Sequence, residues 1–219
     1  MKRGITVYIL IAFGLLLACN SGVSEFEVPS GANEPTIKEG STILVSRQRQ
    51  PNRFDFICFN NEVEGMGNFV AVFRVCGVED DVIEIRNGDL YVNGKMSDDK
   101  FSLQQLYKMP LEEFNRIANQ VNANEAVTNK KKDSVSLFLS SAFVEDHQVK
   151  CNRVLLPENQ KDEDIARVFH ENWNPDHFGP VLVPKGNYFV LGDNRRHAAD
   201  SRYLGFIPKE KWVGTVILK

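Results

Sequence analysis

The distribution of hydrophobic and polar positions divides the chain into a β-rich beginning, a mixed middle and a β-rich end. Short runs of β-branched and aromatic residues between turn residues are typical of strands. Asn87-Gly88 and Asn93-Gly94 tolerate the positive φ of tight turns, so we predict a hairpin over residues 82–95. Strands are predicted at residues 42–45, 54–59, 69–75, 82–85 and 90–92.

The middle of the chain carries hydrophobic residues at helical spacing. Over residues 103–122 this spacing predicts one or two amphipathic helices, with Pro110 as an interruption that can open the second. Residues 134–143 are predicted to form a strand. Acidic residues at the start of 163–173 suit a helix N-terminus, so a further helix is predicted there.

The end of the chain returns to strands. Apolar runs at 181–183 and 187–191 flank a Pro184-Lys185-Gly186 turn, and 212–218 is the last predicted strand. The pattern therefore predicts a mainly β protein. Its β core is formed by residues 24–95 and 179–219, and an α+β insertion covers 96–178.

The first nineteen residues have the features of an export signal. Lys2 and Arg3 precede an apolar run at 4–18, which is too short to span a bilayer comfortably. The run ends in Leu16-Leu17-Ala18-Cys19, which resembles the lipobox of bacterial lipoproteins. That resemblance implies cleavage before Cys19, its acylation, and a lipid anchor on the exported side of the bacterial cell envelope. The alternative is an uncleaved signal anchor in which Cys19 is only a small apolar residue.

Composition and charge narrow the class of protein. The 219 residues are 42% hydrophobic and 25% charged, as in ordinary globular domains, which argues against a disordered tail, a collagen or a coiled coil. Twenty-six Lys and Arg against 29 Asp and Glu give a net charge of −3. Because binding to phosphate backbones relies on a basic excess, a nucleic-acid partner is not predicted.

Cysteine and histidine positions do not suggest a metal site. With Cys19 lipidated, Cys58, Cys76 and Cys151 remain, so at most one intramolecular pair can form. A Cys58–Cys76 bridge and buried free thiols are both open at this point. His147, His170, His177 and His197 are scattered without ligand spacing, so we predict neither a metal nor another cofactor.

The segment from Gly192 to Gly205 is the most informative stretch of the chain. It places charged side chains of both signs directly after an apolar strand, where burial requires that they be paired. The segment resembles the C-terminal signature of the signal peptidase I family, the membrane-anchored serine endopeptidases that remove secretory signal peptides. Further matches occur in the family's order at residues 29–40, 53–59, 74–94 and 178–184. The resemblance implies an antiparallel β domain with a coiled, partly barrel-like sheet and an inserted, variable α+β cap.

The departures from the family's pattern coincide with its reactive residues. The resemblance places the nucleophilic Ser at Ala32 and the general-base Lys at Phe73. Alanine has no nucleophilic atom and phenylalanine cannot accept a proton, so both roles are empty. The Ser that helps to hold the Lys corresponds to Ala198, and the substrate-facing Met corresponds to Asn33.

Other positions of the family's site are retained. The resemblance assigns the oxyanion-hole hydroxyl to Ser30 and keeps Pro35 in the nucleophile segment. It also assigns a bracing role, without direct participation in the reaction, to a polar set comprising Arg74, Asp193, Asn194, Arg195, Asp200, Ser201 and Arg202.

Three functions remain open at the level of sequence. The first is a catalytically inactive, signal-peptidase-like lipoprotein that binds an extended peptide or the signal segment of a preprotein by strand addition, or assists signal-peptide processing. The second is an active serine endopeptidase with Ser30 as a relocated nucleophile and His197 as its base, which requires the two side chains to approach within about 3 Å. The third is an unrelated exported β-protein.

Overall fold

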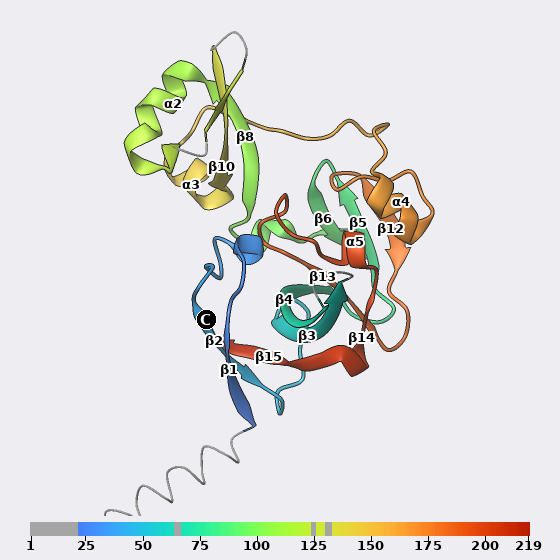
Figure 1. Ribbon diagram of the computed structural model, residues 1–219. Coiled ribbons are helices and arrows are strands. Elements are labelled where there is room, and N and C mark those ends of the chain that lie inside the picture. The colour runs from blue at the N-terminus through green and yellow to red at the C-terminus, as the bar shows by residue number, and fades with distance from the viewer. Residues whose placement is uncertain (1–21, 64–66, 124–125, 130–132) are drawn as a thin grey trace, which may run out of the picture.

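The computed structural model describes residues 22–63, 67–123, 126–129 and 133–219. The predicted signal segment and Cys19 lie outside these residues. The described chain is built mainly from antiparallel strands in three sheets, with short helices at their margins, which confirms the predicted fold class (Figure 1). No helix within the described ranges is long and apolar enough to cross a membrane.

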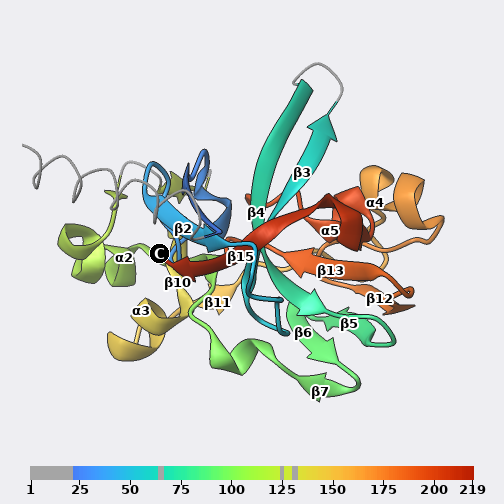
Figure 2. The ribbon, with the colours of Figure 1, turned by 90° about the horizontal axis from the view of Figure 1, so that it is seen from below.

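A seven-stranded sheet forms the centre of the β domain. Its edges are β1 and β14, so it is an open sheet and not a closed barrel. The long hairpin of β3 and β4 pairs from Phe56 opposite Arg74 to Val63 opposite Gly67, and its far end extends beyond the rest of the sheet (Figure 2). In spatial order the strands are β1 (Val23–Glu27), β2 (Thr42–Ser46), β15 (Trp212–Leu218), β3 (Phe56–Val63), β4 (Gly67–Gly77), β13 (Asn187–Leu191) and β14 (Ile207–Pro208).

A smaller sheet contains the predicted hairpin. Asn87 has φ 50° and Gly88 has φ 76° in the turn between β5 and β6, as expected for a tight turn. Asn93 and Gly94 form a second such turn, leading into β7. The hairpin prediction is confirmed. The sheet comprises β12 (Phe178–Leu182), β5 (Val82–Arg86), β6 (Asp89–Val92) and β7 (Lys95–Met96).

Helix α4 (Glu163–Phe169) covers this smaller sheet. Asp162 caps its first turn by accepting hydrogen bonds from two backbone amides, and His170 ends it with φ 60°, so the helix is shorter than the predicted 163–173. Ile165 is fully buried in one apolar cluster with residues of β5, β6, β12 and β13, and Phe169 and Trp173 pack against that cluster.

A third sheet forms a separate cap, which Figure 1 shows at one end of the molecule. Helices α2 (Leu111–Ile117) and α3 (Ser141–Asp146) pack against it around a core that includes Met109, Ile117 and Leu137. The cap strands, in order, are β11 (Asn152–Arg153), β8 (Gln104–Pro110), β10 (Ser134–Ser140) and β9 (Val127–Thr128). The remaining short elements are α5 (Ser201–Leu204) and the 3₁₀ helices Gly31–Asn33, Asp98–Lys100, Ala118–Gln120 and Lys209–Lys211.

The prediction of a helix over residues 103–110 is wrong, because this segment is strand β8. Burial alternates along it, with Gln105, Tyr107 and Met109 inside, which is the period of a strand. Pairing with β10 supplies the hydrogen bonds that a helix would have made internally. The helical part of the prediction holds from Leu111 onward. Similarly, the strand predicted at 134–143 ends at Ser140, whose hydroxyl caps α3.

Candidate functional site

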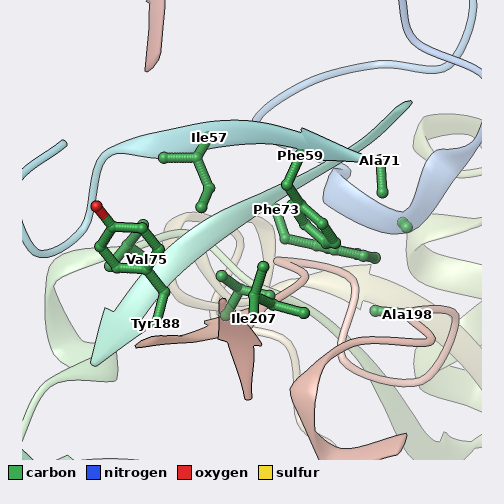
Figure 3. Close-up of a cluster of buried hydrophobic side chains, with 10 residues drawn as sticks. Ile57, Phe59, Ala71, Phe73, Val75, Tyr188, Ala198 and Ile207 are labelled. Atoms are coloured by element: carbon green, nitrogen blue, oxygen red, sulfur yellow. The ribbon is translucent and has the colours of Figure 1, made fainter. Parts of the chain in front are cut away.

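The three positions that the family resemblance assigns to the nucleophile, the base and its supporting serine lie together. Ala32, Phe73 and Ala198 are 7%, 7% and 5% exposed and belong to one apolar cluster, here called the central cluster (Figure 3). The rings of Phe59 and Phe73 lie 6.2 Å apart, centroid to centroid. The full set is Ala32, Ile57, Phe59, Ala71, Phe73, Val75, Tyr188, Val190, Ala198 and Ile207.

Gly192 is the point on which these three positions converge. A Cβ atom added to Gly192 would lie 2.4 Å from the Ala198 Cβ, 2.4 Å from the Ala32 carbonyl oxygen and 3.3 Å from the Phe73 ring. Only glycine fits there without displacing its neighbours. The amide of Asn194 donates a 3.0 Å hydrogen bond to the Ala32 carbonyl, which ties the nucleophile segment to the C-terminal signature.

The segment after Ala32 is fixed against β4. Asn33 is 1% exposed, and its Nδ2 donates a 2.7 Å hydrogen bond to the Val72 carbonyl, while its Oδ1 is buried without a partner among the described atoms. Pro35 follows a cis peptide bond from Glu34. The Asn33 side chain is therefore tied to the backbone of β4 at Val72, the residue immediately before Phe73.

Arg74 and Asp193 form a buried ion pair behind the central cluster. Arg74 Nε lies 2.8 Å from Asp193 Oδ1, and the side chains are 7% and 1% exposed. The hydroxyl of Thr36 donates to the same carboxylate. The guanidinium also lies over the rings of Phe56 and Phe101, at 4.2 and 4.1 Å from their centroids. Both charges are therefore satisfied within the protein.

Two more buried ion pairs organise the signature segment. Arg195 donates to Asp98 at 2.8 Å, and Arg202 Nε donates to Asp200 at 2.9 Å. Burial on its own would lower the pKa of each arginine, but the adjacent carboxylate outweighs it and raises that pKa. Arg195 Nε also donates to the Gly192 carbonyl at 3.1 Å, so the pairs hold the backbone around the central cluster.

The retained Ser201 and Asp200 act on the backbone of the preceding strand. The Val190 amide donates to Ser201 Oγ at 2.9 Å, and the Gly192 amide donates to Asp200 Oδ2 at 3.0 Å. Both polar side chains are fully buried. Their observed role is to fix the end of β13.

A groove of about 450 Å³ lies between the β domain and the cap, beside the central cluster. Ser30 and His197 both line it, along with Ala32 and Phe138. No hydrogen bond joins Ser30 to His197 in the part of the chain that the structure describes. The His197 ring instead contacts the ring of Phe138 edge to face, with centroids 4.6 Å apart. The structure thus brings these residues to one groove without pairing them.

The described cysteines are free thiols. Cys58 and Cys76 are buried in β3 and β4, and burial raises the pKa of each to about 12. Such thiols are poor nucleophiles at neutral pH. The described residues contain no group of three or more His, Cys, Asp or Glu side chains able to hold a metal ion.

Gly192, Asp98 and Thr36 belong to the site but were not predicted from the sequence. The sequence does contain a signal for Gly192, because a glycine directly after an apolar strand indicates that another part of the chain approaches its backbone closely. The sequence contains no such signal for Asp98, because its contact with Arg195 joins residues far apart in the chain. Thr36 lay within the matched nucleophile segment but had no assigned partner.

Comparisons with known proteins find relatives that are named as signal peptidases. "Signal peptidase I" of Buchnera aphidicola subsp. Acyrthosiphon pisum is 27% identical over 88% of this chain, and "Probable signal peptidase I-2" of Synechocystis sp. is 25% identical over 88%. The chain spans 66% and 60% of the length of these two relatives. A crystal structure of a signal peptidase I from Enterococcus faecalis covers 76% of this chain and is itself covered to 97%, at 22% identity and a TM-score of 0.36.

The family comparison covers almost the whole chain. The model of the family described as "Signal peptidase, peptidase S26" matches residues 2–219, which include the central cluster, the cap and the signature segment. The chain belongs to the signal peptidase family.

Proposed function

We propose that this chain is a non-catalytic member of the signal peptidase family that binds an extended peptide, such as the signal segment of a preprotein, on the exported side of the bacterial cell envelope. The observation that carries the proposal is the central cluster. Ala32, Phe73 and Ala198 meet there without a hydroxyl or an amine between them. A nucleophile and a base are both needed for serine-type peptide hydrolysis, and these side chains supply neither.

The remaining site favours binding. The buried ion pairs of Arg74, Arg195 and Arg202 hold the backbone in place independently of the substituted positions. The groove beside the central cluster stays open, at about 450 Å³. A peptide can therefore reach the site, where Ala32 and Phe73 offer neither a nucleophile nor a base. We further propose that a lipid on Cys19 anchors the domain to the membrane, since stable anchoring takes more than one acyl chain and lipoproteins carry several.

The test is cleavage of an exported preprotein by the purified full-length chain in detergent, beside an Ala32→Ser/Phe73→Lys variant. We expect no turnover by the native chain. Turnover by the native chain that disappears in Ser30→Ala would refute the proposal and establish Ser30 as a relocated nucleophile.

Binding needs its own measurement, because absence of cleavage alone does not show it. We expect a fluorescent signal peptide to bind the full chain, and Ser30→Trp to weaken that binding by filling the groove. The matched control is Ser24→Trp, since Ser24 is exposed on β1 outside the groove. Equal binding by both variants would contradict the proposed site.

A further inference from the structure

The groove beside the central cluster has an unbalanced charge. Two carboxylates, Glu34 and Glu39, line it, and no lysine or arginine does. Neither carboxylate forms an ion pair with any residue that the structure describes. By contrast, the buried carboxylates Asp98, Asp193 and Asp200 are each paired with an arginine. The groove is therefore the part of the site where negative charge is left without a partner.

Glu34 and Glu39 reach the groove from one short segment of the chain. A Cβ atom placed on Gly31 would be 3.4 Å from the carboxyl carbon of Glu34, so this carboxyl group stands over the groove-lining backbone. The Glu39 amide lies 3.5 Å from Glu34 Oε1, which brings the two residues to one side of the groove. A cation that enters the groove is attracted by both negative charges.

Two further lining residues of the groove, Asn194 and Phe138, bear on which side chain it accepts. Asn194 is 6% exposed; its Nδ2 donates to the Gly31 carbonyl at 3.1 Å, and its buried Oδ1 has no hydrogen-bond partner among the described atoms. Buried polar atoms are nearly always hydrogen-bonded, so Asn194 carries a spare acceptor at the wall of the groove. Phe138 on β10 gives an apolar surface on which the methylene stem of lysine or arginine packs.

From this combination we infer that the groove selects an extended peptide with a lysine or arginine side chain, and that this side chain lies between Phe138 and the carboxylates of Glu34 and Glu39. The inference rests on the proposed peptide-binding function and names the chemistry of its partner. His197, which contacts Phe138, is the remaining titratable group lining the groove. Two cations are near the groove in the sequence, Lys38 beside Glu39 and Arg196 beside His197; neither lines the groove, and Arg196 is engaged by Asp176.

The test compares two labelled peptides that differ at one position, lysine in one and norleucine in the other. Norleucine keeps the apolar stem and removes the charge. With the full chain in detergent at low salt, fluorescence anisotropy should give about five- to twentyfold tighter binding of the lysine peptide, as expected for two partly exposed ion pairs. In 0.5 M salt the preference should shrink, because screening then acts over only a few ångströms.

Two double variants test whether Glu34 and Glu39 cause the preference for the lysine peptide. Glu34→Gln/Glu39→Gln should bind both peptides equally, with the norleucine peptide unchanged. The control is Glu25→Gln/Glu62→Gln, which removes two exposed carboxylates from β1 and β3, outside the groove. Circular dichroism melts confirm that each variant is folded.

The possible outcomes distinguish failure of this inference from failure of the proposed peptide-binding function. Equal binding of both peptides by the native chain would overturn the inference and leave peptide binding intact. A preference that survives in Glu34→Gln/Glu39→Gln would place the cation elsewhere and also overturn it. Binding of neither peptide would refute the proposed function, and the inference with it.

Discussion

Replacing Phe73 with lysine puts back the side-chain type that the family resemblance expects, in surroundings that are now apolar. Phe73 is 7% exposed and packs among Ala32, Phe59 and Ala198. Truncation of a buried phenylalanine costs about 3–5 kcal/mol. The lysine stem replaces part of the lost contacts, but its amine has to be buried. We therefore expect Phe73→Lys to lower the free energy of unfolding by about 3–5 kcal/mol at pH 7.

Part of this loss depends on pH, and its sign can be derived. Burial favours the neutral amine, so the pKa of the introduced lysine in the folded state falls below its unfolded value of about 10.4. Between those two pKa values the unfolded state binds more protons, so the free energy of unfolding rises with pH. Each pKa unit of difference contributes about 1.4 kcal/mol. The variant should therefore become more stable, relative to the native chain, as the pH rises from 7 toward 10.

Urea denaturation of both proteins at pH 7, 8 and 9, followed by circular dichroism, measures this effect. Phe73→Met is the matched control, because it keeps an apolar side chain of similar volume, costs less than about 1.5 kcal/mol and has no group that titrates. A Phe73→Lys deficit below about 1 kcal/mol, or one that is constant with pH, would refute the reasoning. Either result would mean that position 73 is open to water.

Three further predictions concern a buried ion pair, a tightly packed glycine and the reactivity of two thiols. Asp193→Ala should destabilise the fold by about 3–5 kcal/mol in urea melts, because it leaves Arg74 buried and unpaired; a loss under 1 kcal/mol would contradict this. Gly192→Ala should cost at least about 1–3 kcal/mol in the same assay, since its Cβ would lie 2.4 Å from the Ala32 carbonyl oxygen. In native protein a thiol reagent should label the half-buried Cys151 well before the buried Cys58; equal labelling rates would show that β3 opens readily.

The sequence predicts a segment of this fold well when the hydrogen-bond partners of that segment are close in the chain, and poorly when they are remote. The hairpin over 82–95 was predictable because its turns are local and need the positive φ that Asn87 and Gly88 provide. Segment 104–110 was not, because Leu106 and Tyr107 fit a helical spacing as well as they fit a strand. What decides for the strand is pairing with Ser134–Ser140, which is remote in the sequence.

The same difference between local and remote contacts applies to the candidate site. Ala32, Phe73 and Ala198 were proposed as neighbours only through the family resemblance, and the structure brings them into one cluster. Their convergence on Gly192 depends on how a 3₁₀ turn, β4 and the signature segment pack together, which no local pattern encodes. Ser30 and His197 were considered as a relocated nucleophile and base because both are retained near the expected site, yet in the described chain they share a groove without a hydrogen bond.

The separation of charged and apolar groups explains how this fold accommodates apolar residues at the positions that the family resemblance assigns to reactive ones. Arg74, Arg195 and Arg202 each have a carboxylate partner outside the central cluster, so their charges do not depend on what occupies positions 32, 73 and 198. An alanine and a phenylalanine leave no buried polar group unsatisfied at those positions, whereas a lone serine or lysine there would need a partner. The ion pairs thus hold the backbone around the central cluster whatever side chains fill it. The binding function that we propose needs this framework but no reactive side chain, and the carboxylates of Glu34 and Glu39 are where we place its selectivity.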